Sequence, residues 1–362
     1  MKKKLHVALL FGGKSAEHEI SLISARNIVA AMDKKKYEIV AIGIDKQGRW
    51  HLDQGAKLLR GGGTAKVEFA DASNAAVIMP GNTATPLVRR KGAAGLAGID
   101  VVFPILHGPF GEDGTVQGLL KLANLPFVGA GVLGSAVGMD KDVMKRLLRD
   151  AGIAIGKFMA FERADKISFA KVKRVLGMPL FVKPANLGSS VGISKVAKPS
   201  QFSAAIREAF RYDNKIVIEE FVPGREIECS VLGNDHPIAS LPGEIVVNRD
   251  FYSYDAKYVD AQGSRLEIPA KLPAKVIKEI RRTAIQVYKA LCCQGMGRVD
   301  FFVQANGRVR GHEINTLPGF TKISMYPKMW EATGISYSQL IDRLIRLAMA
   351  RFRQEQRLRS SK

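Results

Sequence analysis

The alternation of strand and helix patterns in the first third of the chain constrains the fold most. An apolar run at residues 5–11 ends in Gly12 and Gly13. The apolar residues that follow recur at spacings of three and four, as along the buried side of a helix: Leu22, Ala25, Val29 and Met32. Further apolar runs at residues 37–44 and 100–105 indicate strands. This strand–helix–strand order predicts a doubly wound parallel sheet, which binds ligands beyond the carboxyl ends of its strands.

The rest of the chain indicates additional parts. Small and glycine-rich sequence at residues 129–140 predicts a boundary, and a helix is expected at residues 141–151. Short strands are then expected at residues 180–183, 191–196 and 215–221, and the clearest later helices at residues 274–291 and 337–353. At roughly 150 residues per domain, a chain of 362 residues predicts two or three domains.

The charge and the cysteines limit the kinds of partner and compartment. The chain has 55 lysines and arginines against 34 aspartates and glutamates, a net charge of +21. No basic run is interleaved with aromatic residues, and no apolar run approaches the roughly 18 residues of a spanning helix. We therefore interpret the excess as a solvated surface and expect neither a nucleic acid nor a membrane as partner. Because Cys229, Cys292 and Cys293 form no CxxC pair, the sequence predicts a reducing, cytoplasmic location.

A hairpin near the carboxyl end carries the strongest local signal for a metal. Asn306-Gly307 separates two strand-like runs at residues 298–303 and 309–315, which predicts a two-residue type I′ turn. With that turn, Asp300 faces Glu313 and Arg298 faces Asn315 on one side of the sheet. Facing carboxylates repel, and a divalent cation such as Mg²⁺ would remove the repulsion. The alternative is an exposed strand face with ordinary charges.

Several other segments could bind a ligand, and each also has a purely structural interpretation. The loop at residues 184–192, after Lys183, is rich in glycine and serine and could cradle phosphate or simply join two strands. Glu219 and Glu220 end a buried strand and could bind adenine or ribose. Residues 251–258 form an aromatic loop around Lys257 that could be a lid or a packed turn. Two single residues at predicted strand or helix ends could bind substrate or only pack: Glu17 and His107.

Taken in order, these segments resemble the D-alanine–D-alanine ligases of the ATP-grasp superfamily over nearly the whole chain. The matching stretches are FGGKSAEHEISL at 11–22, LHGPFGEDGTVQG at 106–118, MDKDVMKRLL at 139–148, FVKPANLGSSVGISKV at 181–196, IEEFVPGREIEC at 218–229, FYSYDAKYVD at 251–260, GRVDFFV at 297–303 and HEINTLPGFTKISMYP at 312–327. Each motif alone is weak, but the ordered set is highly specific.

The resemblance implies a fold and a reaction. The fold would be mixed α/β and α+β: an amino-terminal doubly wound α/β domain at residues 1–138, followed by a two-part ATP-grasp fold. Its parts would be a central lid domain at residues 139–225 and a carboxy-terminal domain at residues 226–362. The reaction would join two D-alanines with ATP through an acyl phosphate, giving D-alanyl-D-alanine for peptidoglycan, ADP and phosphate. A homodimer and a monovalent cation also belong to the family's pattern.

The resemblance also implies a role for each matching residue. The ligands for two Mg²⁺ (or Mn²⁺) ions would be Asp300, Glu313 and Asn315. The residues that contact ATP, with the lysines on its phosphates, would be Lys141, Lys183, Ser190, Glu219, Glu220, Phe221, Val222, Glu226 and Lys257.

The substrate contacts follow in the same way. Glu17 would anchor the first D-alanine's ammonium and would be linked through Ser189 to Tyr258, and His107 would lie near the carboxyl group of this D-alanine. Arg298 and the Gly319 amide would stabilise the oxyanion of the tetrahedral intermediate. The second D-alanine's carboxylate would be held by the Ser324 side chain and the Met325 amide.

Three alternatives stay open. The nearest is a ligase that joins D-alanine to D-lactate or D-serine, although Tyr258 matches the residue that accompanies a D-alanine acceptor. The second is another ATP-grasp carboxylate–amine ligase, disfavoured by the joint presence of Glu17, Ser189 and Tyr258. The third is a basic nucleic-acid-binding protein with a vestigial site. The family motifs do not account for the net charge of +21 or for the basic tail after Arg343.

Overall fold

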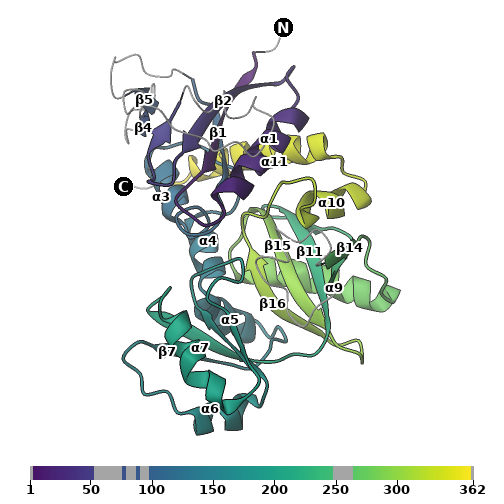
Figure 1. The fold of residues 1–362 in the computed structure, drawn as a ribbon. Coiled ribbons are helices and arrows are strands. Elements are labelled where there is room, and N and C mark those ends of the chain that lie inside the picture. Colours follow the sequence, from purple (N-terminus) through teal and green to yellow (C-terminus); the bar gives the residue numbers. More distant parts are fainter. Residues whose placement is uncertain (1–2, 53–75, 79–86, 90–97, 248–263, 360–362) are drawn as a thin grey trace.

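The computed structural model describes residues 3–52, 76–78, 87–89, 98–247 and 264–359. Three sheets, each with its own helices, make up the molecule, and the amino-terminal, central and carboxy-terminal regions of the chain each contribute one of them (Figure 1). A small antiparallel ribbon lies outside them and consists of β4 (Ala76–Ile78) and β5 (Leu87–Arg89).

The amino-terminal sheet has the strand order β3-β2-β1-β6. β1 (Leu5–Gly12) lies parallel to both β2 (Tyr37–Ile44) and β6 (Val101–Ile105), and β3 (Trp50–His51) pairs antiparallel with β2. The sheet is accompanied by α1 (His18–Ala31) and α3 (Thr115–Leu122). The predicted parallel strand–helix–strand arrangement is therefore confirmed.

Two helices lead from this sheet to the central one: α4 (Val132–Met139) and α5 (Lys141–Asp150). The central sheet is antiparallel in the order β7-β10-β8-β9, with β7 (Phe158–Glu162), β8 (Leu180–Pro184), β9 (Ser194–Val196) and β10 (Lys215–Glu220). Its own hydrophobic cluster lies against α6 (Phe169–Leu176) and α7 (Phe202–Ala209), which follows the short helix η2 (Pro199–Gln201).

The carboxy-terminal sheet has the order β14-β13-β11-β15-β16, and β12 pairs with β11. Its strands are β11 (Arg225–Gly233), β12 (Ile238–Ala239), β13 (Gly243–Val247), β14 (Ser264–Glu267), β15 (Gly295–Val303) and β16 (Val309–Asn315). The helix α9 (Ala274–Ala290) buries its apolar side, including Val276, Ile280 and Val287, in the same hydrophobic cluster as this sheet. The chain then continues through α10 (Met325–Ala332) and α11 (Tyr337–Glu355).

The last helix returns to the first sheet. Figure 1 draws α11 in yellow beside the purple α1 and β1. Leu340, Ile341 and Leu344 of α11 belong to the hydrophobic cluster that contains β1 and β6. Arg351 is buried there, and its guanidinium donates to the carbonyls of Phe127 and Gly129 at 2.7 and 2.6 Å. The two ends of the chain therefore share one core.

The predicted hairpin forms, but its turn differs from the prediction. Gln304 pairs with Arg308 through a 3.0 Å backbone hydrogen bond, so residues 305–307 form a three-residue loop. Gly307 has a φ of +79°, as the last position of such a loop requires. The predicted two-residue type I′ turn is therefore wrong, because the chain uses the longer loop and places the flexible glycine at its end.

Candidate active site

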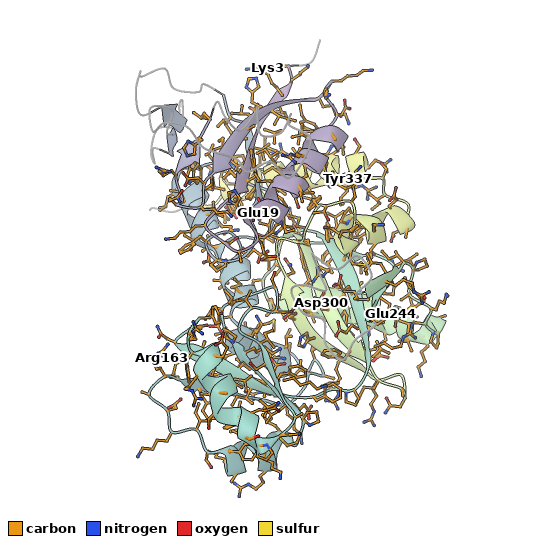
Figure 2. The ribbon with its side chains drawn as sticks, in the orientation of Figure 1. Lys3, Glu19, Arg163, Glu244, Asp300 and Tyr337 are labelled. Carbon is orange, nitrogen blue, oxygen red and sulfur yellow. The ribbon has the colours of Figure 1, made fainter. Side chains whose placement is uncertain are left out.

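A pocket between the central and carboxy-terminal sheets brings together most of the predicted nucleotide residues. β8, β10 and the loop after β8 supply one wall, and β11, β15 and β16 supply the other. Asp300 lies on this second wall, near the middle of the molecule (Figure 2). The predicted site residues that line the pocket are Lys141, Lys183, Ser189, Ser190, Glu219, Glu220, Phe221, Val222, Glu226, Arg298, Asp300 and Glu313.

The pairing of β15 with β16 places the predicted metal ligands opposite one another. Asp300 faces Glu313 and Arg298 faces Asn315, as predicted. Nearer the turn the register differs by one residue, since Phe301 faces Gly311, and a β-bulge at His312 makes up the difference. The bulge places both His312 and Glu313 in the pocket wall, where regular alternation would separate them.

Arg298 organises the acidic side of the pocket. Its Nε and Nη2 donate to the two oxygens of Asp300 at 2.8 and 2.7 Å. Its Nε also lies 3.0 Å from Oε2 of Glu228 on β11. Burial disfavours the charged guanidinium, but Asp300 and Glu228 outweigh this effect and raise the pKa of Arg298 well above its usual value. Arg298 therefore carries a fixed positive charge at the centre of the site.

The opposite wall carries a buried cluster of lysines around one carboxylate. Oε2 of Glu219 lies 2.9 Å from Nζ of Lys183, and Oε1 lies 3.4 Å from Nζ of Lys145. Burial alone would raise the pKa of Glu219, but Lys145 and Lys183 lower it to about 2. Lys141 is also buried, and burial lowers its pKa. The cluster holds three lysines around one ionised glutamate, which favours an anionic ligand.

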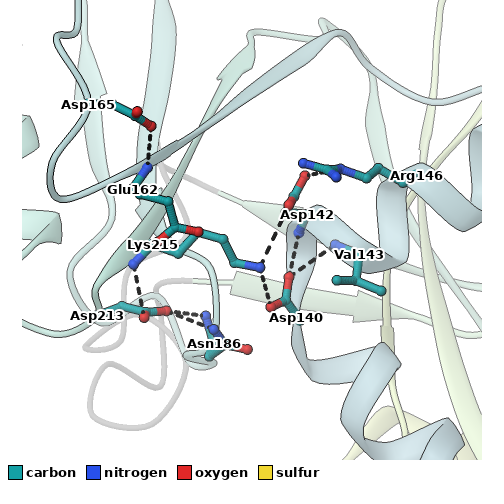
Figure 3. Close-up of polar contacts among 9 residues, drawn as sticks. All are labelled: Asp140, Asp142, Val143, Arg146, Glu162, Asp165, Asn186, Asp213 and Lys215. Carbon is teal, nitrogen blue, oxygen red and sulfur yellow. Dashed lines mark hydrogen bonds and ion pairs between the residues drawn. The ribbon is translucent and has the colours of Figure 1, made fainter.

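The start of α5 fixes Lys141 in this cluster. Asp140 caps the helix by accepting from the amides of Asp142 and Val143 at 3.1 and 3.0 Å. The ammonium of Lys215 on β10 lies 2.5 Å from Asp140 and 3.6 Å from Asp142. Figure 3 marks both contacts with dashed lines. This pairing ties the helix to the central sheet. The Lys141 ammonium then reaches into the pocket and donates to the Leu187 carbonyl at 2.6 Å.

The glycine and serine loop has an unusual backbone at the pocket. Ser189 and Ser190 have φ angles of +54° and +61°, values that residues other than glycine rarely adopt. Both residues line the pocket. Strained backbone of this kind is typical of ligand-binding loops. The phosphate-cradle interpretation of this loop therefore gains support over a simple connection between strands.

The far end of the pocket suits a flat, partly polar group. Phe221 is 42% exposed, and the centre of its ring lies 6.3 Å from that of Phe181. Glu220 accepts from the backbone amide of Lys157 at 2.8 Å. Val222 and Glu226 complete this end of the wall. An aromatic and aliphatic surface with nearby carboxylates fits a nucleobase and a sugar.

A second group of predicted residues lies beyond the carboxyl ends of β1 and β6. Glu17 precedes α1 and His107 follows β6, and both are buried. The Nδ1 of His107 lies 3.6 Å from Oε1 of Glu112, and its Nε2 lies 3.5 Å from Oγ of Ser24. Burial opposes protonation of His107, but Glu112 and Glu17 outweigh it and raise its pKa. This group can bind a small zwitterion through its charges.

The predicted acceptor residues lie at the start of α10. The Oγ of Ser324 accepts from the Thr321 amide at 2.9 Å and lies 2.8 Å from the Thr321 hydroxyl. A Cβ at position 319 would lie 2.8 Å from this oxygen, so a larger residue there would displace the Ser324 side chain. Met325 is the first residue of α10 and is buried. The first amide groups of an α-helix have no acceptor within the helix, and such groups are suited to bind anions.

The predicted metal ligands have suitable chemistry. Asp300 and Glu313 supply hard carboxylate oxygens on one pocket wall, and Oδ1 of Asn315 already accepts from the Leu317 amide at 3.0 Å. Among the residues that the structure describes, no cluster of three histidines, cysteines or carboxylates is placed to hold a metal by itself. Two predicted site residues, Lys257 and Tyr258, lie outside the described ranges.

Sequence comparison shows the family. A family model described as "D-ala D-ala ligase N-terminus" matches residues 6–130. A second, described as "D-ala D-ala ligase C-terminus", matches residues 147–346. A D-alanine–D-alanine ligase of Shouchella clausii is 53% identical over 99% of this chain and 98% of its own length. The chain belongs to the D-alanine–D-alanine ligase family. D-alanine–D-alanine ligase A of Escherichia coli K12 is 50% identical over 99% of this chain and all of its own length.

Solved ligase structures agree with this fold. The D-alanine–D-alanine ligase of Coxiella burnetii superposes with a TM-score of 0.86 at 42% identity, covering 98% of this chain and 96% of its own. The VanG D-Ala:D-Ser ligase of Enterococcus faecalis gives 0.85 at 37% identity, covering 96% and 100%. The predicted ATP-grasp architecture is confirmed. Membership of this ligase family supports ATP-dependent joining of two D-alanines and, through it, a role in cell wall synthesis.

The site of this ligase contains three residues that sequence reasoning missed. His312 lines the pocket only because of the bulge. Burial lowers its pKa to about 3, and the charge of Lys183 acts in the same direction. Glu112 pairs with His107, and Lys145 pairs with Glu219. The motif stretches contained all three residues, but only the fold shows which site residues they contact.

No described helix of this ligase is both long and apolar enough to cross a membrane.

Proposed function

We propose that the pocket joins two D-alanines in two steps, with the predicted residues in the roles given above. In the first step a carboxylate oxygen of one D-alanine attacks the γ-phosphorus of ATP. The bond from this phosphorus to ADP breaks, and an acyl phosphate forms. In the second step the amine of the other D-alanine attacks the acyl carbon, loses a proton and displaces phosphate. The observation that carries this proposal is Arg298, a cation fixed between Asp300 and Glu228 on the wall facing the lysine cluster.

The lysine wall would bind the nucleotide. Lys141 and Lys183 would hold phosphate oxygens, joined by Lys257 and by the Ser190 loop. Adenine and ribose would be bound by Glu219 of the lysine cluster and by the residues at the far end of the pocket: Glu220, Phe221, Val222 and Glu226. Both oxygens of Glu219 face lysines, so its contribution to nucleotide binding would pass in large part through them.

Asp300, Glu313 and Asn315 would hold the divalent ions, Mg²⁺ or Mn²⁺. These ions supply positive charge that neutralises the phosphate oxygens during transfer. The protein holds this pair of carboxylates in place: Arg298 fixes Asp300, and the bulge at His312 fixes Glu313. The family resemblance also supports a monovalent cation.

The two D-alanines would bind between the pocket and the amino-terminal sheet. Glu17 would hold the ammonium of the first D-alanine and would be linked through Ser189 to Tyr258, and His107 would lie near the first carboxyl group. Arg298 and the Gly319 amide would stabilise the tetrahedral oxyanion. Ser324 and the Met325 amide would take the second carboxylate. The resemblance further supports a homodimer that works in the cytoplasm.

A ligase with a D-serine acceptor is the second candidate, because the VanG D-Ala:D-Ser ligase is a structural neighbour at 37% identity. The presence of Tyr258 favours D-alanine. The deciding experiment measures ADP release with ATP and Mg²⁺ and identifies the products by mass. D-Alanine is supplied alone, with D-lactate or with D-serine, and L-alanine is the control.

D-Alanyl-D-alanine as the dominant product in every mixture supports the proposal. A mixed product at equal acceptor concentrations contradicts the D-alanine preference. A Tyr258→Phe variant tests the residue itself. If its preference for D-alanine over D-lactate at neutral pH is unchanged, Tyr258 does not have the proposed role.

A further inference from the structure

Lys145 is a buried cation for which the proposed reaction has no direct use. It lies on α5 one helical turn after Lys141, and its side chain is only 2% exposed. It is not one of the residues that line the pocket. Its ammonium is 3.4 Å from Oε1 of Glu219 and donates to the carbonyl of His312 at 3.4 Å. A buried ammonium is costly unless it is paired, so its retention here calls for an explanation.

The pairing of Glu219 gives that explanation. Its Oε2 contacts Lys183 and its Oε1 faces Lys145, so the carboxylate is shared between two lysines. The three charges together sum to +1. If Lys145 were neutral, Glu219 and Lys183 would form a pair with no net charge. The Lys183 ammonium would then attract a phosphate group much less strongly, because the adjacent carboxylate would repel that phosphate.

We propose that Lys145 is a positioning residue that neutralises Glu219, so that the Lys183 ammonium stays available for the polyphosphate of the nucleotide. This inference rests on the proposed assignment of Lys183 to the phosphate oxygens. It differs from a purely structural role, in which Lys145 would only hold Glu219 and the His312 carbonyl in place. The two roles differ in which ligands they affect.

The test compares binding of ADP and adenosine to the full chain by titration calorimetry. In a Lys145→Met variant we expect ADP to bind at least about tenfold more weakly. Adenosine, which has no phosphate, is expected to bind within about twofold of the native affinity. A Lys145→Arg variant keeps the charge and should restore most of the ADP affinity. Equal weakening of both ligands, or an unchanged affinity for ADP, would overturn the inference.

A double variant separates charge from structure more sharply. Adding Glu219→Gln to Lys145→Met removes the carboxylate that would otherwise neutralise Lys183. We therefore expect the double variant to bind ADP more tightly than Lys145→Met alone and close to Glu219→Gln alone. If Lys145 had only a structural role, the losses of ADP affinity in the two single variants would add in the double variant. An additive result therefore contradicts the proposal.

Two further variants distinguish the possible failures. Lys183→Met should weaken ADP binding and spare adenosine; if it spares both, the phosphate assignment of Lys183 and this inference fail together. If Lys183→Met is selective and Lys145→Met is not, only this inference fails. Lys171→Met, at an exposed position of α6, removes the same charge far from the cluster and should leave ADP binding unchanged. If Lys171→Met weakened ADP binding as much as Lys145→Met does, the effect would come from the net charge of the protein. That result would overturn the role of Lys145.

Discussion

The Arg298 guanidinium holds both oxygens of the Asp300 carboxylate, through hydrogen bonds of 2.8 Å from Nε and 2.7 Å from Nη2. The two residues are two positions apart on β15, so their side chains lie on the same face of the strand. A proposed metal ligand and a proposed oxyanion-stabilising residue are thus fixed as one rigid unit. Any change in the shape of the guanidinium must disturb both functions.

Arg298→Lys tests this unit. Lysine keeps the charge but cannot donate to two oxygens in the same plane. We expect kcat to fall about 100-fold, the size of effect seen when an oxyanion donor is lost. Mn²⁺ binding, followed by electron paramagnetic resonance, should weaken as Asp300 becomes free to rotate. Arg225→Lys is the matched control, since Arg225 makes a similar fork to Glu244 on the same sheet. Equal losses of kcat in both variants would contradict the prediction.

The low pKa of Glu219 predicts a pH-dependent stability. The pKa in the folded protein is about 2, below the usual value of 4.5. The ionised carboxylate therefore stabilises the fold fully above pH 4.5, and this contribution is lost as the pH falls through about 2. The native protein should exceed Glu219→Gln in melting temperature at neutral pH, and the gap should narrow steadily as the pH falls from 4.5 towards 2. Thermal unfolding followed by circular dichroism measures this difference in melting temperature. A difference that does not depend on pH would refute the pairing of an ionised Glu219 with the lysines.

Ser324→Ala tests the acceptor site. Loss of a hydrogen bond to a charged group costs about 1.5–3 kcal/mol, which is roughly ten- to a hundredfold in affinity. We expect the KM of the second D-alanine to rise by at least about tenfold while the KM of ATP stays the same. Steady-state kinetics with varied D-alanine give both values. Ser336→Ala removes the cap of α11 and serves as a control that lowers stability without this change in KM. A rise in the KM of ATP as well would argue against a specific role.

Arg351→Met tests the connection between α11 and the amino-terminal sheet. The variant leaves the carbonyls of Phe127 and Gly129 without their guanidinium donor. We expect the free energy of unfolding to fall by about 3 kcal/mol. Chemical denaturation measures the change, and Arg353→Met, at an exposed position of the same helix, should cost much less. Similar costs at both positions would show that the buried contacts contribute little.

The sequence predicts those parts of the fold that depend on local patterns. The apolar run before Gly12 and the helical spacing after it determine β1 and α1, because each pattern is complete within a few residues. The packing of α11 on the first sheet could not be read in this way. Its apolar residues, such as Leu340 and Leu344, indicate a buried face but do not identify the surface that covers it.

The candidate site shows the same division. The facing of Asp300 and Glu313 was predicted correctly, although the predicted turn was wrong. A longer loop shifts the register by one residue, and the bulge at His312 shifts it back. Bulges depend on tertiary packing, so no local pattern signals one. The pairing of Lys145 with Glu219 joins residues 74 positions apart and likewise needs the fold.

The return of α11 to the first sheet has a consequence for synthesis of the chain on the ribosome. The strands β1 and β6 emerge early, but part of their hydrophobic cluster consists of residues 340–348. Residue 340 follows the end of β6 at residue 105 by 340 − 105 = 235 positions, which takes about 12 to 47 s at typical synthesis rates of about 5–20 residues per second. During this interval the first sheet exposes apolar surface that α11 covers later. The core of the amino-terminal region can therefore be completed only after α11 has been synthesised.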